Sequence, residues 1–400
     1  MELVSLGRIR AARELLAGVA RQTPLEHSRV LEQRFGGPVH LKCENLQRTG
    51  SFKIRGAYLR IHGLSDEERA RGVVAASAGN HAQGVALAAR LLGAAATVFM
   101  PSGAPLPKLA ATKSYGADVH LVGATLEDAL TEATDFAERT GAVFIHPFDH
   151  PDVVAGQGTV GLEILDQLPQ VRTILVATGG GGLVGGIAAG VKSARSDVRV
   201  IGVQAEQAAA WPTSLAAGRP VALPSMNTMA DGIAVGKPGE VTYAHVAKLV
   251  DDMITVSEES LSRALLLCLE RAKMLVEPAG AAAVAAVLDN PGRFEAPVCA
   301  VLSGGNIDPL LLLHVIQHGM VAAGRYLSLR IVIPDRPGSL AGLLSRVGEL
   351  GANVVDVAHS RLGRSVALGE VDVALSLETR GTDHCAQVVQ SLRAAGYKVN

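Results

Sequence analysis

Apolar and polar positions follow two spacings along most of the chain. Short apolar runs, typical of buried strands, are separated by longer stretches with the spacing of amphipathic helices. In a first series the predicted strands cover residues 72–76, 95–100, 118–122 and 143–145, and the predicted helices cover residues 82–92, 108–115 and 125–140. Strands that alternate with helices in this way indicate βα units and a mostly parallel sheet.

A second series of the same kind follows a proline-bounded turn at residues 147–151. Its predicted strands cover residues 173–177, 198–203 and 298–302, and its predicted helices cover residues 156–167, 183–193, 257–275 and 279–288. Residues 205–240 are less regular. Before the first series we expect helix over about residues 4–31, broken near residues 23–25, and a short strand at residues 39–42. Two α/β halves with a cleft between them fit this order better than one continuous sheet.

The spacing changes after residue 328. Strands are predicted at residues 329–333, 354–359, 368–378 and at the end of the chain up to Asn400, with helices at residues 339–350 and 383–395. This βαββαβ order is that of a ferredoxin-like domain. We therefore expect two domains, residues 1–325 with a smaller lobe at about 45–145, and residues 328–400.

Composition narrows the class of protein. A hydrophobic content of 48% with 19% charged residues indicates a globular chain, and a formal charge of −1 gives no general attraction to nucleic acid or anionic membranes. We expect no membrane span and no signal peptide, because no apolar run is long enough and the N-terminus lacks the basic-then-apolar order. Cys43, Cys268, Cys299 and Cys385 form no CxxC pair, which suits reduced thiols in the cytoplasm.

Residues 49–56 contain the first candidate for chemistry. Ser51 is predicted to cap a helix, which places the Lys53 amine at a loop-to-helix junction with Phe52 as an apolar wall. A lysine that loses its water has a lowered pKa and becomes a nucleophile that can form a Schiff base. The alternative is an ordinary surface lysine near a helix start.

Four consecutive glycines at residues 179–182 lie at a predicted strand-to-helix turn. Free amides and the positive helix end favour a phosphate there, and glycine lets the backbone approach its oxygens. Gly180, Gly182 and Gly185 also satisfy the dinucleotide fingerprint, with Glu206 placed to bind a ribose. A third possibility is a tight glycine turn without a ligand.

Two further polar turns follow predicted strands. Residues 77–81 offer backbone amides with Ser and Asn side chains at a helix start, which is a good carboxylate site, although Asn80 could also be an ordinary cap. Residues 303–306 form a second glycine turn that begins with Ser303. A lysine Schiff base together with a phosphate turn suggests pyridoxal phosphate (PLP).

These segments together resemble a known enzyme family. Residues 51–56, 77–81, 179–182 and 303–306 are similar to those of the threonine dehydratases, PLP enzymes that share the two-lobed tryptophan synthase β-subunit fold, with parallel sheets flanked by helices. The resemblance covers nearly all of residues 1–325. Residues 335–340 and 351–353 resemble an ACT regulatory domain.

The resemblance assigns roles to individual residues. Lys53 would hold PLP and later remove the substrate Cα proton, Asn80 would bind the phenolic oxygen, and Ser303 would face the pyridine nitrogen. The role of Glu277, which matches another family position, stays open. In full, the implied cofactor-binding residues are Phe52, Lys53, Asn80, Gly179, Gly180, Gly181, Gly182 and Ser303, and the implied substrate-binding residues are Ser77, Ala78, Gly79, Asn80 and His81.

The implied reaction is β-elimination of L-threonine, and of L-serine, to 2-oxobutanoate or pyruvate and ammonia. Serine racemases of this group carry a serine where this chain has Ala78, so dehydration is favoured over racemisation. No divalent metal site is expected, because the acids that bind such an ion in those relatives would align near Gln204 and Ala210, and neither residue is an acid. Glu206 and Ala208 remain as oxygen donors for a monovalent ion. The alternatives are a serine racemase or serine dehydratase, an NAD-dependent dehydrogenase with the same regulatory domain, and a non-enzymatic amino-acid sensor.

The resemblance also implies regulation and assembly. ACT domains usually pair across subunits, so we expect a homo-oligomer, a dimer or a tetramer. Isoleucine is the expected inhibitor, with valine as an opposing ligand, if the enzyme catalyses the first step of isoleucine biosynthesis. A catabolic role is the alternative.

Overall fold

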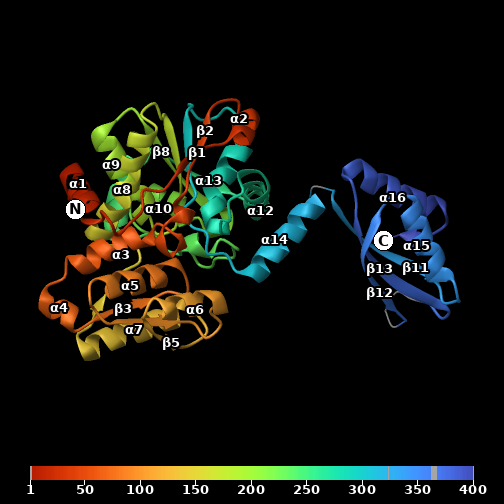
Figure 1. The fold of residues 1–400 in the computed structure, drawn as a ribbon, viewed down its shortest axis with the longest axis horizontal. Helices are drawn as coiled ribbons and strands as arrows, with labels where there is room; N and C mark the ends of the chain where they lie inside the picture. Colours follow the sequence, from red (N-terminus) through yellow and green to blue (C-terminus); the bar gives the residue numbers. More distant parts are fainter. Residues whose placement is uncertain (1, 323, 362–366, 400) are drawn as a thin grey trace. The chain divides into compact units, whose positions relative to one another are not determined.

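The computed structural model describes residues 2–322, 324–361 and 367–399, which form two compact units (Figure 1). The first unit comprises residues 1–309 and the second residues 310–400. Asn400, at which the last strand was expected to end, lies outside the described residues. No helix in the described part of the chain is long and apolar enough to cross a bilayer.

The first unit contains two sheets. The larger has the strand order β1-β2-β10-β7-β8-β9, and its strands are parallel except for β1, which is antiparallel to β2. The smaller, wholly parallel sheet has the order β5-β4-β3-β6. The strand bounds are β1 Leu25–His27, β2 Val39–Lys42, β3 Val73–Ala76, β4 Ala96–Met100, β5 Asp118–Leu121, β6 Val143–Phe144, β7 Thr173–Ala177, β8 Arg199–Ala205, β9 Asp252–Val256 and β10 Val298–Val301. The alternation of strands and helices and the mostly parallel pairing confirm the predicted α/β class.

Thirteen α-helices accompany these sheets within the described part of the first unit. They are α1 Leu6–Leu15, α2 Arg29–Phe35, α3 Lys53–His62, α4 Asp66–Ala70, α5 Asn80–Leu91, α6 Leu106–Ser114, α7 Leu126–Thr140, α8 Pro151–Gln167, α9 Gly182–Ala194, α10 Ala210–Ala217, α11 Glu240–Leu249, α12 Glu258–Leu267 and α13 Pro278–Asp289. Short 3-10 turns are η1 Glu44–Leu46, η2 Arg48–Gly50, η3 Glu206–Ala208 and η4 Asp231–Ile233, and a π-helix, η5, covers Cys268–Ala272.

Two predictions for the first unit were wrong in detail. The segment expected to be helical over residues 4–31 contains α1, strand β1 and the start of α2, and the sequence pattern missed β9. β1 is only three residues long and exists through its pairing with β2, where Leu25 faces Lys42. Such a short strand forms through a long-range pairing that local periodicity does not show.

Close backbone contact fixes α3, the helix that begins with Lys53, against α8. A Cβ added at Gly156 would lie 2.7 Å from the carbonyl oxygen of Arg55, so a larger residue there would push the helices apart. The Arg55 side chain is 1% exposed and forms ion pairs with Glu44 at 2.8 Å and Glu163 at 2.6 Å. Lys42, also buried, pairs with Glu163 at 2.6 Å. Breaking one of these buried pairs would leave a charge without a partner in the interior, which is costly. The network therefore fixes the position of the first turn of α3.

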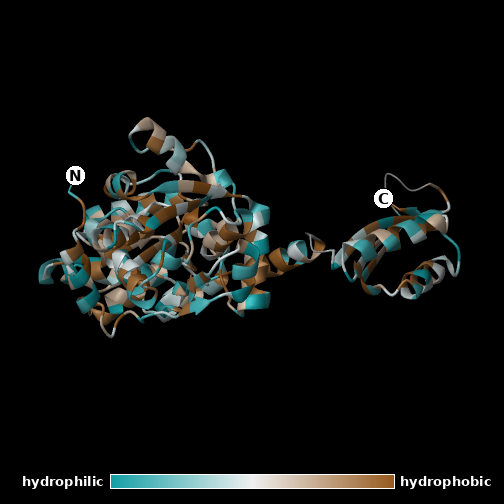
Figure 2. Ribbon diagram, turned by 90° about the horizontal axis from the view of Figure 1, so that it is seen from above, coloured by the Kyte–Doolittle hydropathy of each residue, from teal (hydrophilic) through white to brown (hydrophobic). Residues whose placement is uncertain are grey.

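The second unit has the βαββαβ order predicted from the sequence. Its elements are α14 Pro309–Ala322, β11 Tyr326–Pro334, α15 Ser339–Glu349, β12 Asn353–Ser360, β13 Glu370–Glu378, α16 Thr382–Ala394 and β14 Lys398–Val399. The strands form one antiparallel sheet of order β12-β13-β11-β14. Hydrophobic and hydrophilic residues alternate along this sheet in Figure 2, and the inward residues of β13, which include Val373 and Leu375, are fully buried.

Candidate active site

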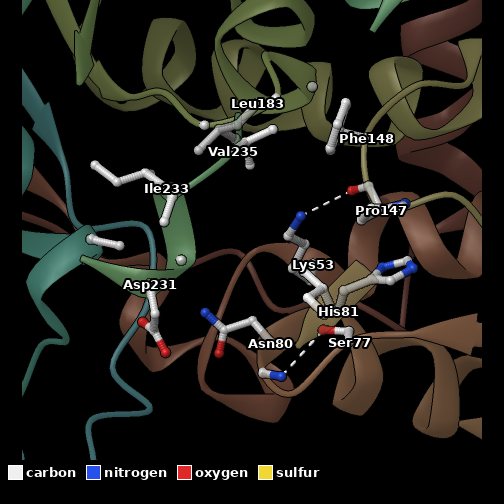
Figure 3. A pocket seen from close by; sticks show the side chains of 18 of the residues that line it. Lys53, Ser77, Asn80, His81, Pro147, Phe148, Leu183, Asp231, Ile233 and Val235 are labelled. Carbon is white, nitrogen blue, oxygen red and sulfur yellow. Dashed lines mark hydrogen bonds between the residues drawn. The ribbon is translucent and has the colours of Figure 1, made fainter. Parts of the chain in front are cut away.

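A cavity of about 560 Å³ lies in the first unit, between the smaller sheet with α3 and α5 and the larger sheet with α9 (Figure 3). It is lined by segments that are far apart in the sequence. Among its lining residues are all those predicted for the site, namely Phe52, Lys53, Ser77, Ala78, Gly79, Asn80, His81, Gly179, Gly180, Gly181, Gly182 and Ser303. The fold therefore brings together every residue that the family resemblance assigned to cofactor or substrate binding.

Lys53 is the first residue of α3 and projects into this cavity. Its Nζ donates a hydrogen bond to the carbonyl oxygen of Pro147 at 2.9 Å (Figure 3). The same atom lies 5.2 Å from the centre of the Phe52 ring. Burial lowers the pKa of Lys53 from 10.5 to about 8, and the nearby Glu277 carboxylate opposes this shift. About a tenth of the amine is therefore neutral, and nucleophilic, at pH 7, far more than for an ordinary lysine.

The helix start at Lys53 is held differently from our prediction. Phe52 takes the N-cap position without a side-chain hydrogen bond, and the Ser51 hydroxyl is buried without a partner. Backbone contacts with the 303–306 turn position the start of α3. Ser51 pairs with Gly304 in an isolated β-bridge, and Phe52 N donates a hydrogen bond to the carbonyl oxygen of Ser303 at 3.3 Å. Ser51 is thus not the predicted cap. Its backbone instead joins the Lys53 loop to the Ser303 turn.

The 77–81 turn connects β3 to α5. Asn80 does not cap α5, since its Nδ2 donates to Glu277 Oε1 at 2.5 Å and its Oδ1 accepts from Asn306 Nδ2 at 2.8 Å. Ser77 Oγ accepts a hydrogen bond from Gly79 N at 3.2 Å. The capping interpretation of Asn80 is therefore wrong, and its amide faces the cavity beside Lys53 (Figure 3).

His81 lies in the same turn but carries no charge. Its Nε2 donates to the carbonyl oxygen of Ile145 at 2.7 Å, and its side chain is almost wholly buried. Burial, reinforced by the charge of Lys53, lowers the pKa of His81 to about 3. The imidazole is therefore neutral at physiological pH and cannot supply a cation to an anionic ligand.

The 179–182 turn leads from β7 into α9, and only glycine fits it. Gly181 has a φ of +94°, and a Cβ added at Gly180 would collide with the Phe148 ring. A Cβ at Gly181 would collide in the same way with Trp211, whose Nε1 donates to the carbonyl oxygen of Gly179 at 2.7 Å. Free backbone amides at the start of a helix favour an anion. The bare glycine backbone and these amides fit a phosphate group.

Ser303 and Glu277 complete the wall of the cavity. Ser303 follows β10 and is 4% exposed. The Glu277 carboxyl group is 2% exposed, and burial, with the charge of Asp231 as a smaller contribution, raises the pKa of Glu277 to about 7. The cavity thus contains a lysine and a carboxyl group that both titrate near neutral pH, which is common at functional sites.

Three further residues of the cavity had no signal in the sequence. Lys108 of α6 pairs with Asp231 of η4 at 2.5 Å, and the two are separated by more than a hundred residues in the chain. His146 lines the cavity near Phe148, and burial lowers the pKa of His146 to about 4. Asp231 lies in the segment that the pattern described only as irregular, so its partner could not be found without the fold.

The dinucleotide interpretation is not supported by the geometry. Glu206, the predicted ribose acid, is exposed in η3 and is not among the lining residues of the cavity. Gly185 lies inside α9, where a Cβ would come within 3.2 Å of the His245 Cβ, so this glycine serves helix packing. The fingerprint is therefore a coincidence of the glycine-rich turn and the helix that follows it.

The potential metal ligands of the described residues are dispersed over the fold. Within the described ranges no three His, Cys, Asp or Glu side chains come together in a way that could hold a metal ion. Gln204, where a metal-binding acid was considered, uses its amide to bridge the backbone, donating to Ala208 O at 3.3 Å and accepting from Trp211 N at 3.0 Å.

Comparisons with known proteins agree with this geometry. A family model described as "Pyridoxal-phosphate dependent enzyme" matches residues 16–304. The chain is 48% identical over 397 residues to an L-threonine ammonia-lyase of Thermotoga maritima, covering 99% of both chains. The processed form of threonine deaminase isoform 2 from Solanum lycopersicum has a TM-score of 0.76 at 38% identity and covers 79% of this chain and 87% of its own.

A serine racemase of maize is similar in structure as well. It has a TM-score of 0.74 at 36% identity and covers 80% of this chain and 99% of its own. The fold is thus shared by relatives named for different reactions, so the reaction must be argued from the site. The lysine at the cavity, the glycine turn and the extent of these matches establish that the chain belongs to the family of pyridoxal-phosphate dependent enzymes.

Proposed function

We propose that this chain is an L-threonine ammonia-lyase that converts L-threonine to 2-oxobutanoate and ammonia, and L-serine to pyruvate and ammonia. The observation that carries the proposal is the presence in one cavity of the Lys53 amine, the glycine turn at 179–182 and the polar 77–81 turn. The names of the relatives from Thermotoga maritima and Solanum lycopersicum support threonine as the substrate.

The residues of the cavity suit the cofactor of the family. PLP supplies an aldehyde that condenses with amines and a conjugated ring that delocalises negative charge from the substrate. Lys53 would bond to the aldehyde carbon and the amides of residues 179–182 would bind the phosphate. Asn80 and Ser303, which face the same cavity, would meet the polar atoms of the ring. Because Ser303 is a neutral residue, it would leave the ring nitrogen without a proton.

Lys53 is also the base of the proposed reaction. With a pKa lowered to about 8, its amine can accept the Cα proton of threonine. Loss of the β-hydroxyl group as water leaves an enamine, which tautomerises and takes up water to give the keto acid and ammonia. The methyl group of Ala78 provides no proton donor in the 77–81 turn, which favours elimination over racemisation.

We extend the proposal to regulation by an amino acid, isoleucine or valine, bound by the second unit. A hollow of about 320 Å³ after β11 supports this idea, since it is lined by groups of both charges, as a zwitterion requires. These charged groups are Asp335, Arg336 and Arg361, of which Arg361 and Asp335 pair at 2.8 Å. In this proposal the enzyme is a cytoplasmic dimer or tetramer that catalyses the first step of isoleucine biosynthesis.

Product assays test the reaction directly. The purified protein with PLP should form 2-oxobutanoate from L-threonine, and Lys53→Ala should abolish this, while Lys113→Ala, an exposed lysine of α6, should not. Addition of isoleucine should lower the rate and valine should oppose that effect. Interconversion of L- and D-serine without keto acid would contradict the lyase, and a rate unaffected by either amino acid would contradict the regulation.

A further inference from the structure

Lys108 is a buried cation of the cavity that neither the proposed reaction nor the cofactor uses. It comes from α6, and its side chain is 8% exposed. A Cβ added at Gly79 would lie 3.8 Å from its Nζ, so the ammonium group stands against the 77–81 turn. The side chain therefore reaches the place where a substrate carboxylate is expected.

Asp231 holds the Lys108 ammonium in this place. The two side chains meet at 2.5 Å, and Asp231 belongs to η4, which packs on α13 through Gly232 and Ala279. Figure 3 shows the Asp231 carboxyl group on the far side of Asn80 from Lys53. An ammonium group has three N–H donors, so a single acceptor from Asp231 leaves capacity for a second anion. Asp231 itself is 56% exposed, and water weakens its hold on the cation.

Among the basic residues that line the cavity, Lys108 is the one available to pair with a substrate carboxylate. The basic side chains of the cavity are Lys53, His81, Lys108 and His146. Both histidines are neutral, because burial lowers the pKa of His81 to about 3 and that of His146 to about 4. In the proposed function Lys53 bonds to the cofactor aldehyde and is not available to pair with a carboxylate. A carboxylate that leaves water needs an opposite charge as well as neutral donors.

We propose that Lys108 binds the substrate carboxylate together with the 77–81 turn, and that it selects amino acids with a free α-carboxylate over their amides and esters. This inference rests on the proposed function only in taking an amino acid as the ligand. It makes Lys108 a specificity-determining residue for the same cavity.

A binding experiment without turnover separates this role from others. Glycine and glycinamide both condense with PLP but have no β-hydroxyl group to lose, so the visible spectrum of the PLP-loaded protein can report binding of each. Lys108→Met should weaken glycine binding about 10- to 100-fold, the range for a hydrogen bond to a charged group, and change glycinamide binding less than about threefold. Lys108→Arg should retain most of the affinity for glycine.

Two further variants keep the experiment decisive. Lys108→Gln keeps a hydrogen-bond donor but removes the charge, and should also weaken glycine binding selectively. Lys113→Met on the exposed side of α6 is the matched control and should change neither affinity. Equal losses for glycine and glycinamide, or no loss for glycine, would overturn the proposal. A protein that binds glycine as expected but does not form 2-oxobutanoate from L-threonine would instead refute the proposed lyase.

Discussion

The Glu277 carboxyl group lies in the cavity between groups of both charges. It accepts a hydrogen bond from Asn80. The positive charges of Lys108 and Lys53 lower its pKa, and the negative charge of Asp231 raises it. Burial is the largest effect and raises the pKa of Glu277 from 4.5 to about 7. The group therefore changes its charge in the pH range in which the Lys53 amine also begins to lose its proton.

A pH-dependent stability follows from Glu277. Its folded pKa exceeds its unfolded pKa, so its contribution is present below pH 4.5 and is lost as the pH rises to about 7. A shift of this size costs about 3 kcal/mol above pH 7. Glu277→Gln should therefore gain stability relative to the parent as the pH rises from 5 to 8, measured by urea unfolding of the PLP-free protein. Exposed Glu240→Gln is the control, and parallel pH curves for parent and Glu277→Gln would contradict this account.

The sequence was informative about residues whose local surroundings carry the chemistry. Lys53 follows a glycine turn and an aromatic residue, and Gly181, which has a positive φ, lies in a run of glycines. In both cases the neighbouring residues in the sequence indicate the role. Lys108 and Asp231 leave none, because each is an ordinary polar residue until the fold brings them together. The raised pKa of Glu277 also depends on burial by distant segments, which no local pattern contains.

At the scale of elements, adding a single methyl group to the turn before α9 tests whether this turn binds the phosphate of PLP. Gly180→Ala would collide with the Phe148 ring and displace the amides that we propose bind the phosphate. PLP affinity should fall about tenfold or more, by analogy with the cost of overpacking a tight site. Fluorescence or absorbance titration of the PLP-free protein measures it. Gly7→Ala in α1 is the matched control, because a Cβ there would make only an ordinary contact with Ser5 Oγ at 3.9 Å. Unchanged PLP affinity in Gly180→Ala would exclude the turn as the phosphate site.

Elements were predicted well where periodicity is strong and poorly where pairing is long-range. The strands around β3 and β7 are buried apolar runs next to amphipathic helices, so their type followed from local pattern. β1 and β9 are edge strands of the larger sheet and are defined by their neighbours β2 and β8. The start of α3 is a similar case, since backbone contacts with Gly304 replaced the expected Ser51 cap.

At the scale of the whole molecule, the two units divide the proposed tasks. The cavity lies entirely within residues 1–309, and the family model ends at residue 304. The hollow with groups of both charges belongs to the second unit. Catalysis and amino-acid sensing are thus proposed for separate parts of the chain.

Removal of residues 326–400, which contain the hollow of the second unit, should separate these tasks. A chain that ends at residue 325 keeps every residue that lines the cavity, so it should form 2-oxobutanoate from L-threonine. Its rate should no longer respond to isoleucine or valine at concentrations that alter the full chain. Arg361→Ala in the full chain, which removes a charge from the hollow, should reduce the response and preserve the rate. A shortened enzyme that still responds to either amino acid would place the regulatory site in the first unit.

The central claim is that Lys53 carries the cofactor. Borohydride reduction of the purified, PLP-loaded protein, followed by mass analysis of its peptides, locates the modified lysine. We expect a pyridoxyl phosphate adduct on the peptide that contains Lys53, and loss of that adduct and of the visible absorption band in Lys53→Ala. An adduct on Lys108 or another lysine, or a colourless protein that takes up no PLP, would contradict the account.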